Sequence, residues 1–217
     1  LMGCNEDDEM MPTMPGVVNL GSGDVGILNY AYALEQLEAA FYAEVMKGSY
    51  FANASAEEKT IMGDLEKHER AHREFFKVAL GSNAIGDLEV DFSAIDFNSR
   101  NSVLAAAKTF EDLGVAAYNG AGQFLESADL LLIAGKIVSV EARHAAAIRD
   151  LINPNSVDFA GDDIIDANGL ERTLNFQQVL RNLAAVAQLR QAAVEALDAL
   201  GVAGHVARLQ QVQAVAA

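Results

Sequence analysis

The sequence predicts an all-α fold: a four-helix bundle with a long crossover between its second and third helices, plus one or two C-terminal helices. From about residue 24 onward, apolar residues recur with helical spacing, and no segment shows the alternation typical of a strand. Proline, the strongest helix breaker, occurs only three times. Two long stretches without a helical pattern, 82–100 and 155–169, divide the helices into groups.

The first two helices have recognisable boundaries. The first is predicted over about 24–47, and Gly48 is the expected stop. The second opens at residues 55–58, because Ser-Ala-Glu-Glu has the spacing of a capping box. It continues to about Leu80, just before Gly81.

The next two helices follow a long connection. Segment 82–100 predicts a crossover from one end of the bundle to the other. The third helix is expected over about 102–125. The fourth begins at Ser127 or Asp129 and ends near Ile152, just ahead of a proline.

We expect a single domain over residues 24–217, with its four-helix core at 24–152. The C-terminal helices lie within 171–217, as a fifth helix over about 175–200 and a short sixth after Gly201. We expect these helices either to cover the bundle or to build a subunit contact. In the second alternative the protein is a homodimer.

The chain is strongly acidic, with a formal net charge of -16. Such a surface repels a phosphate backbone, so we expect no binding to nucleic acid. The same field concentrates metal cations near the protein. No run approaches the roughly 18 apolar residues of a membrane-spanning helix, so we expect membrane attachment only through a lipid anchor.

The N-terminal tetrapeptide, Leu-Met-Gly-Cys4, resembles the bacterial lipobox, in which lipid is attached to the cysteine. Residues 1–23 are acidic and contain proline and glycine, the composition of a flexible tether. We therefore expect a lipoprotein of the bacterial cell envelope, at the periplasmic or outer-membrane surface, whose sequence begins inside a signal peptide. The alternative is a chance match.

Two predicted helices contain the same Glu-x-x-His motif. Glu69 and His72 lie in the second helix, and Glu141 and His144 lie in the fourth. Residues three apart share one face of a helix, so each pair can direct a carboxylate and an imidazole at one point. From the composition, chance predicts about a third of one such pair.

The first and third helices each supply a glutamate followed by a tyrosine. Glu35 precedes Tyr42 by two helical turns, and Glu111 precedes Tyr118 by the same interval. The chain therefore contains an internal repeat of a helix pair. Glu38 lies one turn from Glu35 and could replace it or join it.

Four glutamates among core residues predict a metal site. Carboxylates buried together repel one another, and some would have to take up protons. Two divalent cations would cancel the four charges. Carboxylates with imidazoles suit iron or manganese, and zinc also enters such sites. We therefore expect two iron ions, with manganese as the alternative and zinc in a purified sample. The glutamates are Glu35, Glu69, Glu111 and Glu141.

This order of motifs resembles that of the ferritin-like superfamily, which includes ferritins, rubrerythrins and other di-iron or di-manganese carboxylate proteins. The resemblance covers residues 24–152, and segment 28–42 is similar to the branch that includes plant desiccation-related proteins. It implies a ferritin-like four-helix bundle in which Glu69 and Glu141 bridge or chelate the metals. The histidine of each motif would bind one metal.

The resemblance also implies roles for the other repeated residues. Glu35 and Glu111 would be terminal or bridging ligands. Tyr42 and Tyr118 would be donors or redox-active neighbours of the ligands, with ordinary core packing as the alternative. Many relatives have an acidic residue just before the second motif, where this chain has Val140, so the surroundings of a ligand histidine differ.

The second helix also matches His-Glu-x-x-His, the helix of zinc peptidases. In that alternative Glu69 would be the general base, and His68 and His72 would bind zinc. A third ligand is not evident, and Phe75 stands where one large class has glycine. Otherwise His68, like His205, is a surface or packing histidine without an assigned role.

The expected activity is oxidoreductase chemistry on Fe(II), oxygen or peroxide, of the ferroxidase, peroxidase or catalase type. Rubrerythrin-like peroxide reduction would need a partner that donates electrons, since the chain contains no Cys-x-x-Cys module. The alternative is a metal-free bundle that acts as a structural or stress-related interaction protein of the envelope.

Overall fold

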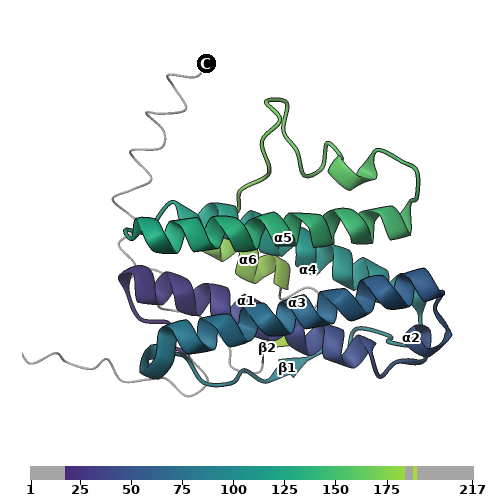
Figure 1. Ribbon diagram of the computed structural model, residues 1–217, viewed down its shortest axis with the longest axis horizontal. Helices are drawn as coiled ribbons and strands as arrows, with labels where there is room; N and C mark the ends of the chain where they lie inside the picture. The colour runs from purple at the N-terminus through teal and green to yellow at the C-terminus, as the bar shows by residue number, and fades with distance from the viewer. Residues whose placement is uncertain (1–17, 184–187, 190–217) are drawn as a thin grey trace, which may run out of the picture.

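The computed structural model describes residues 18–183 and 188–189 (Figure 1). Cys4, most of the predicted tether, His205 and the helix predicted after Gly201 lie outside the described residues. Within the described part, no helix is both long enough and apolar enough to cross a membrane. Lipid attachment at Cys4 stays a prediction.

Four long helices form the body of the molecule (Figure 1). They are α1 (Gly23–Val45), α3 (Ala56–Leu80), α4 (Arg100–Gly122) and α5 (Ala128–Ile152). Helix α1 packs mainly against α3, and α4 packs mainly against α5, so the bundle consists of two helix pairs. The predicted all-α four-helix bundle is confirmed.

Side chains cap these helices near the predicted starts. The Ser55 hydroxyl accepts a hydrogen bond from the backbone N–H of Glu58 at 3.1 Å, as the capping box requires. Ser127 caps α5 in the same way. Helix α4 begins slightly earlier than expected, because the Ser99 hydroxyl accepts a hydrogen bond from the Ser102 N–H.

The connection between α3 and α4 contains more structure than the sequence indicates. After the 3-10 turn η1 (Gly81–Asn83), strand β1 (Val90–Asp91) pairs antiparallel with β2 (Gln188–Leu189). This short pairing leaves the all-α fold class unchanged. Two-residue strands are too short to show alternation, and this pairing joins distant parts of the chain. A short helix, α2 (Ser49–Asn53), also lies between α1 and α3.

The fifth helix is not continuous over 175–200 as predicted. Helix α6 covers Phe176–Leu183, whereas Gln188–Leu189 form β2. Pairing with β1 overrides the local helix preference of these residues. The Phe176 ring packs edge-on against Tyr30 of α1, with centroids 4.7 Å apart, so α6 covers part of the bundle core.

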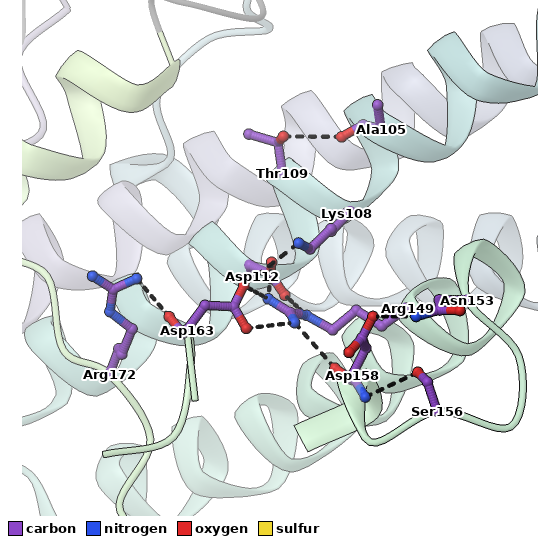
Figure 2. Close-up of polar contacts among 10 residues, drawn as sticks. All are labelled: Ala105, Lys108, Thr109, Asp112, Arg149, Asn153, Ser156, Asp158, Asp163 and Arg172. Atoms are coloured by element: carbon purple, nitrogen blue, oxygen red, sulfur yellow. Dashed lines mark hydrogen bonds and ion pairs between the residues drawn. The ribbon is translucent and has the colours of Figure 1, made fainter. Parts of the chain in front are cut away.

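A long loop that includes η2 (Asp158–Ala160) joins α5 to α6 and is tied down by Arg149 (Figure 2). The guanidinium group donates to both carboxylate oxygens of Asp163, at 2.9 and 2.8 Å, and to both of Asp112, at 2.8 and 2.7 Å. Arg149 is only 2% exposed. This buried arginine therefore fastens the loop to α4.

Candidate metal centre

Charged side chains project into the apolar interior from all four long helices. The glutamates predicted as metal ligands are completely buried, at 0% exposure: Glu35 on α1, Glu69 on α3, Glu111 on α4 and Glu141 on α5. Burying an ionised carboxylate is costly unless opposite charge or hydrogen bonds compensate it. The surroundings of these groups therefore decide what they do.

One group of four side chains converges from α1, α3 and α5. Glu35, Glu69, His72 and Glu141 each place one potential ligand atom within 4.8 Å of the others. The Nδ1 atom of His72 lies 2.8 Å from Glu141 Oε1 and 3.4 Å from Glu35 Oε2. It lies 3.5 Å from Glu69 Oε2. Three carboxylate oxygens thus surround one imidazole nitrogen.

A second group converges from α3, α4 and α5: Glu69, Glu111, Glu141 and His144. The Nδ1 atom of His144 lies 2.7 Å from Glu69 Oε1, 3.4 Å from Glu141 Oε2 and 3.5 Å from Glu111 Oε2. Glu69 and Glu141 belong to both groups, and each turns a different oxygen toward each histidine. This arrangement suits carboxylates that bridge two cations.

The contacts are short, yet they lack hydrogen-bond geometry. When a nitrogen and an oxygen approach to 2.7 Å without a proton aligned between them, their lone pairs can share a cation instead. The residues present therefore fit a pair of metal ions. The buried atoms without a hydrogen-bond partner include Oε2 of Glu35 and Glu111, both oxygens of Glu69 and Glu141, and Nδ1 of His72 and His144.

The same burial shifts the pKa values of these groups. Desolvation raises the pKa of Glu111 to about 8 and that of Glu35 well above its usual range. Burial acts to lower the pKa of His72, but the contacts with Glu141 and Glu35 outweigh it and raise this pKa to about 12. Burial acts to raise the pKa of Glu69, but the two histidines lower it to about 2. Without metal, protons supply the positive charge that the centre requires.

Two tyrosines orient the outer carboxylates across the bundle. The Tyr42 hydroxyl donates to Glu111 Oε1 at 2.5 Å, and the Tyr118 hydroxyl donates to Glu35 Oε1. In each glutamate the other oxygen faces a histidine. Burial raises the pKa of both phenols well above its usual range, so they stay protonated. Each tyrosine therefore hydrogen-bonds to the glutamate of the other half of the repeat.

Glu38 is a further buried carboxyl, 2% exposed, that lies outside both groups of convergent side chains found in the described residues. Burial, and then repulsion by the neighbouring glutamates, raise its pKa well above the usual range. A Cβ atom on Gly114 would lie 3.0 Å from Glu38 Oε1, so this glycine leaves room for the carboxyl. Of Glu35 and Glu38, it is Glu35 whose carboxylate lies beside His72, with Oε2 at 3.4 Å from His72 Nδ1.

His68, which the sequence left without a role, lies against His144. The two rings meet edge to edge, with centroids 5.2 Å apart and planes 8° apart, and His68 Nδ1 is 3.0 Å from His144 Nε2. Spacing within one helix could not reveal this contact, since the residues are 76 positions apart. In the zinc-peptidase alternative His68 and His72 would share an ion, but His68 belongs to neither group of convergent ligands.

A cavity of about 390 Å³ lies away from this centre and is lined by charged residues around Arg149. A much smaller apolar cavity, of about 20 Å³, is bordered by Leu34, Phe76 and Tyr118. Tyr118 borders this small cavity and also hydrogen-bonds to Glu35, so one side chain separates the cavity from a candidate ligand.

Comparison with protein families gives an independent result. The model of the ferritin-like domain matches residues 23–154. The match spans all four long helices and therefore includes both groups of convergent side chains. Among curated proteins, none matches the chain.

Proposed function

The chain belongs to the family of ferritin-like domains, and we propose that it holds two iron ions and performs oxidoreductase chemistry on Fe(II), oxygen or peroxide. The observation that carries this proposal is the sharing of Glu69 and Glu141 between two groups of potential ligands. A buried pair of carboxylates with oxygens directed to both sides supports two adjacent cations better than one.

The donor set supports iron as the metal. Each ion would have carboxylate oxygens and one imidazole nitrogen, which suits iron or manganese and also admits zinc. Two divalent cations would neutralise the four buried carboxylates and replace the protons they otherwise hold. One ion would be held by Glu35, Glu69, His72 and Glu141, and the other by Glu69, Glu111, Glu141 and His144.

A pair of redox-active ions would supply the electrons that reduce oxygen or peroxide. The residues of this chain would orient the ligands and control protons. Tyr42 fixes one oxygen of Glu111, and Tyr118 fixes one oxygen of Glu35, which leaves the second oxygen of each for metal. Each phenol also keeps a proton beside a ligand carboxylate, within one hydrogen bond of it.

The space beside the centre favours a small oxidant. The apolar cavity next to Leu34 and Tyr118, at about 20 Å³, has room for a molecule about the size of water. An organic substrate would not fit there without rearrangement of the core. This supports a ferroxidase, peroxidase or catalase reaction over oxygenation of a larger molecule.

We propose the bacterial cell envelope as the location, with lipid attached to Cys4. The support is the lipobox-like tetrapeptide and the acidic stretch behind it. Labelled palmitate fed to expressing cells should enter the protein, and Cys4→Ala should abolish the incorporation. Equal labelling of the variant would contradict lipidation at this residue.

Elemental analysis tests the metal proposal. Protein purified without added metal or chelator, loaded with Fe(II) under anaerobic conditions and then exposed to air, should retain about two iron ions per chain. Glu69→Gln should lose both ions, because Glu69 contributes to both groups. If the protein binds neither iron nor manganese, the proposal is wrong.

Glu38→Gln is the matched control, since it removes a buried carboxyl that belongs to neither group. This variant should retain both ions, and circular dichroism checks that every variant is folded. Consumption of oxygen or peroxide in the presence of Fe(II) would indicate ferroxidase chemistry. Consumption of peroxide by the loaded protein without free Fe(II) would indicate a catalase.

A further inference from the structure

The two halves of the metal centre differ at one position of the internal repeat. Helices α3 and α5 both carry Glu-x-x-His, and the residue just before the motif is His68 in α3 but Val140 in α5. The imidazole of His68 can accept a hydrogen bond from a ligand histidine. The isopropyl group of Val140 cannot.

His68 is placed to make such a bond. Its Nδ1 atom is 3.0 Å from Nε2 of His144, on the side of that ring away from the carboxylates. The His144 side chain is almost fully buried, whereas His68 is exposed. His144 therefore has carboxylates at one ring nitrogen and an imidazole at the other.

Metal binding would determine which nitrogen of each ring carries a proton. A cation at His144 Nδ1 requires that nitrogen's lone pair, so the single ring proton lies on Nε2. Nε2–H then donates to His68 Nδ1, and His68 carries its own proton on Nε2. The hydrogen bond fixes both the tautomer and the orientation of the ligand ring.

We propose that His68 is a positioning residue for His144 and makes the two metal positions unequal, with the ion at His144 bound more tightly than the ion at His72. The inference rests on the proposed pair of metal ions. Loss of the outer hydrogen-bond partner of a ligand histidine typically weakens metal binding by 10–100-fold.

Titration of the full chain with Co(II), after removal of metal by a chelator, tests the inference. Wild-type protein should bind two Co(II) ions with affinities that differ by about tenfold or more. His68→Ala should weaken the tighter binding event by about tenfold. His68→Gln should restore it, because the amide oxygen can accept the same hydrogen bond.

Two background variants show which ion responds. Glu35→Gln removes a ligand from the His72 position, and Glu111→Gln removes one from the His144 position. His68→Ala should weaken Co(II) binding in the Glu35→Gln background and leave it unchanged in the Glu111→Gln background. An equal effect in both backgrounds, or in neither, overturns the inference.

The outcomes separate this inference from the proposed function. If wild-type protein binds no pair of Co(II) ions, the inference is wrong, whereas the proposed function is rejected only if iron and manganese also fail to bind. If it binds two ions but His68→Ala changes neither affinity, only the role of His68 is wrong. A general loss of fold is monitored by circular dichroism, and the exposed position of His68 makes the substitution a mild one.

A spectroscopic signature gives a second readout that does not depend on activity. In protein loaded with diamagnetic Zn(II), long-range nitrogen–proton correlation spectra report which ring nitrogen carries the proton. His68 should be protonated on Nε2, and so should His144. A proton on His68 Nδ1 would show that it does not accept the bond, and would overturn the inference.

Discussion

Arg149 and the central glutamates are both charged groups inside the bundle, but their charges are compensated in different ways. Arg149 is 2% exposed, and its guanidinium donates to Asp112, Asp163 and the carbonyl of Asp158 (Figure 2). The glutamates at the candidate metal centre turn oxygens toward two histidines, and those oxygens have no hydrogen-bond partner.

This difference indicates what each cluster is for. A buried charge that meets well-aligned partners holds the fold together, as Arg149 does between α4, α5 and the following loop. A buried set of carboxylates with unpaired oxygens depends on something that is not part of the chain, either protons or cations. The first cluster should therefore respond to substitution as a structural contact, and the second as a binding site.

The largest expected effect on stability is at Arg149. Arg149→Met should lower the free energy of unfolding by about 3 kcal/mol, because two aspartates lose a buried partner. The value lies at the low end of the range for such pairs, since the Asp163 side chain is 56% exposed. Urea denaturation in the presence of a chelator measures it.

Lys108→Met is the matched control. Lys108 also contacts Asp163, at 3.5 Å, but it is a surface pair. Loss of this ion pair should lower the free energy of unfolding by at most about 1 kcal/mol. If both variants lose the same stability, the contrast between the buried arginine and the surface lysine is wrong.

An effect of similar size but opposite sign is expected at the candidate metal centre. Glu111→Gln should raise the unfolding free energy of the metal-free protein by about 3 kcal/mol near pH 7, because burial raises the pKa of Glu111 from 4.5 to about 8. The amide oxygen can still accept the hydrogen bond from Tyr42. In the presence of Fe(II) the same variant should lose stabilisation by metal, which thermal unfolding with and without Fe(II) measures.

The adjacent residue supplies the control for this prediction. Asp112 is next to Glu111 in the chain but pairs with Arg149. Asp112→Asn should therefore destabilise the protein with or without metal. The same sign of change for both variants in the metal-free protein would contradict the comparison.

The smallest expected effect is a dependence of stability on pH. In the folded metal-free protein the pKa of Glu111 is raised from 4.5 to about 8, and that of His72 from 6.5 to about 12. Between pH 6.5 and 8 the folded state therefore binds more protons than the unfolded state, and stability falls as pH rises. The melting temperature in chelator should be a few degrees lower at pH 8 than at pH 6.5.

Glu111→Gln should reduce this pH dependence, since one of the two groups no longer titrates. The Arg149 cluster should not contribute in this range, because Arg149 holds the pKa of Asp163 well below its usual value. A melting temperature that rises between pH 6.5 and 8 would contradict the assigned shifts.

Most of the bundle could be predicted from local patterns. The start of α3 followed from the capping box at Ser55, and the start of α5 followed from a serine at the cap position. The glutamates and histidines of both Glu-x-x-His motifs face inward because residues three apart share a helix face. These features depend on a few neighbouring residues, which is why they are readable without the structure.

Comparison of the two repeat halves offered further signals. Glu38 lies three residues after Glu35, whereas the matching position after Glu111 is Gly114. The structure shows that the glycine makes room for the extra carboxyl. The difference between His68 and Val140 was visible in the same way, but its meaning required knowledge of what lies opposite each residue.

Composition and periodicity were enough to predict the four long helices and the helix face on which each candidate ligand lies. Packing decided that Tyr42 reaches Glu111, that His68 contacts the ring edge of His144, and that residues 188–189 leave the helical pattern to pair with β1. The physical reason is range: a helix is set by contacts within about four residues. Which helix face packs against which neighbouring helix depends on how all the side chains of the core fill the space between helices.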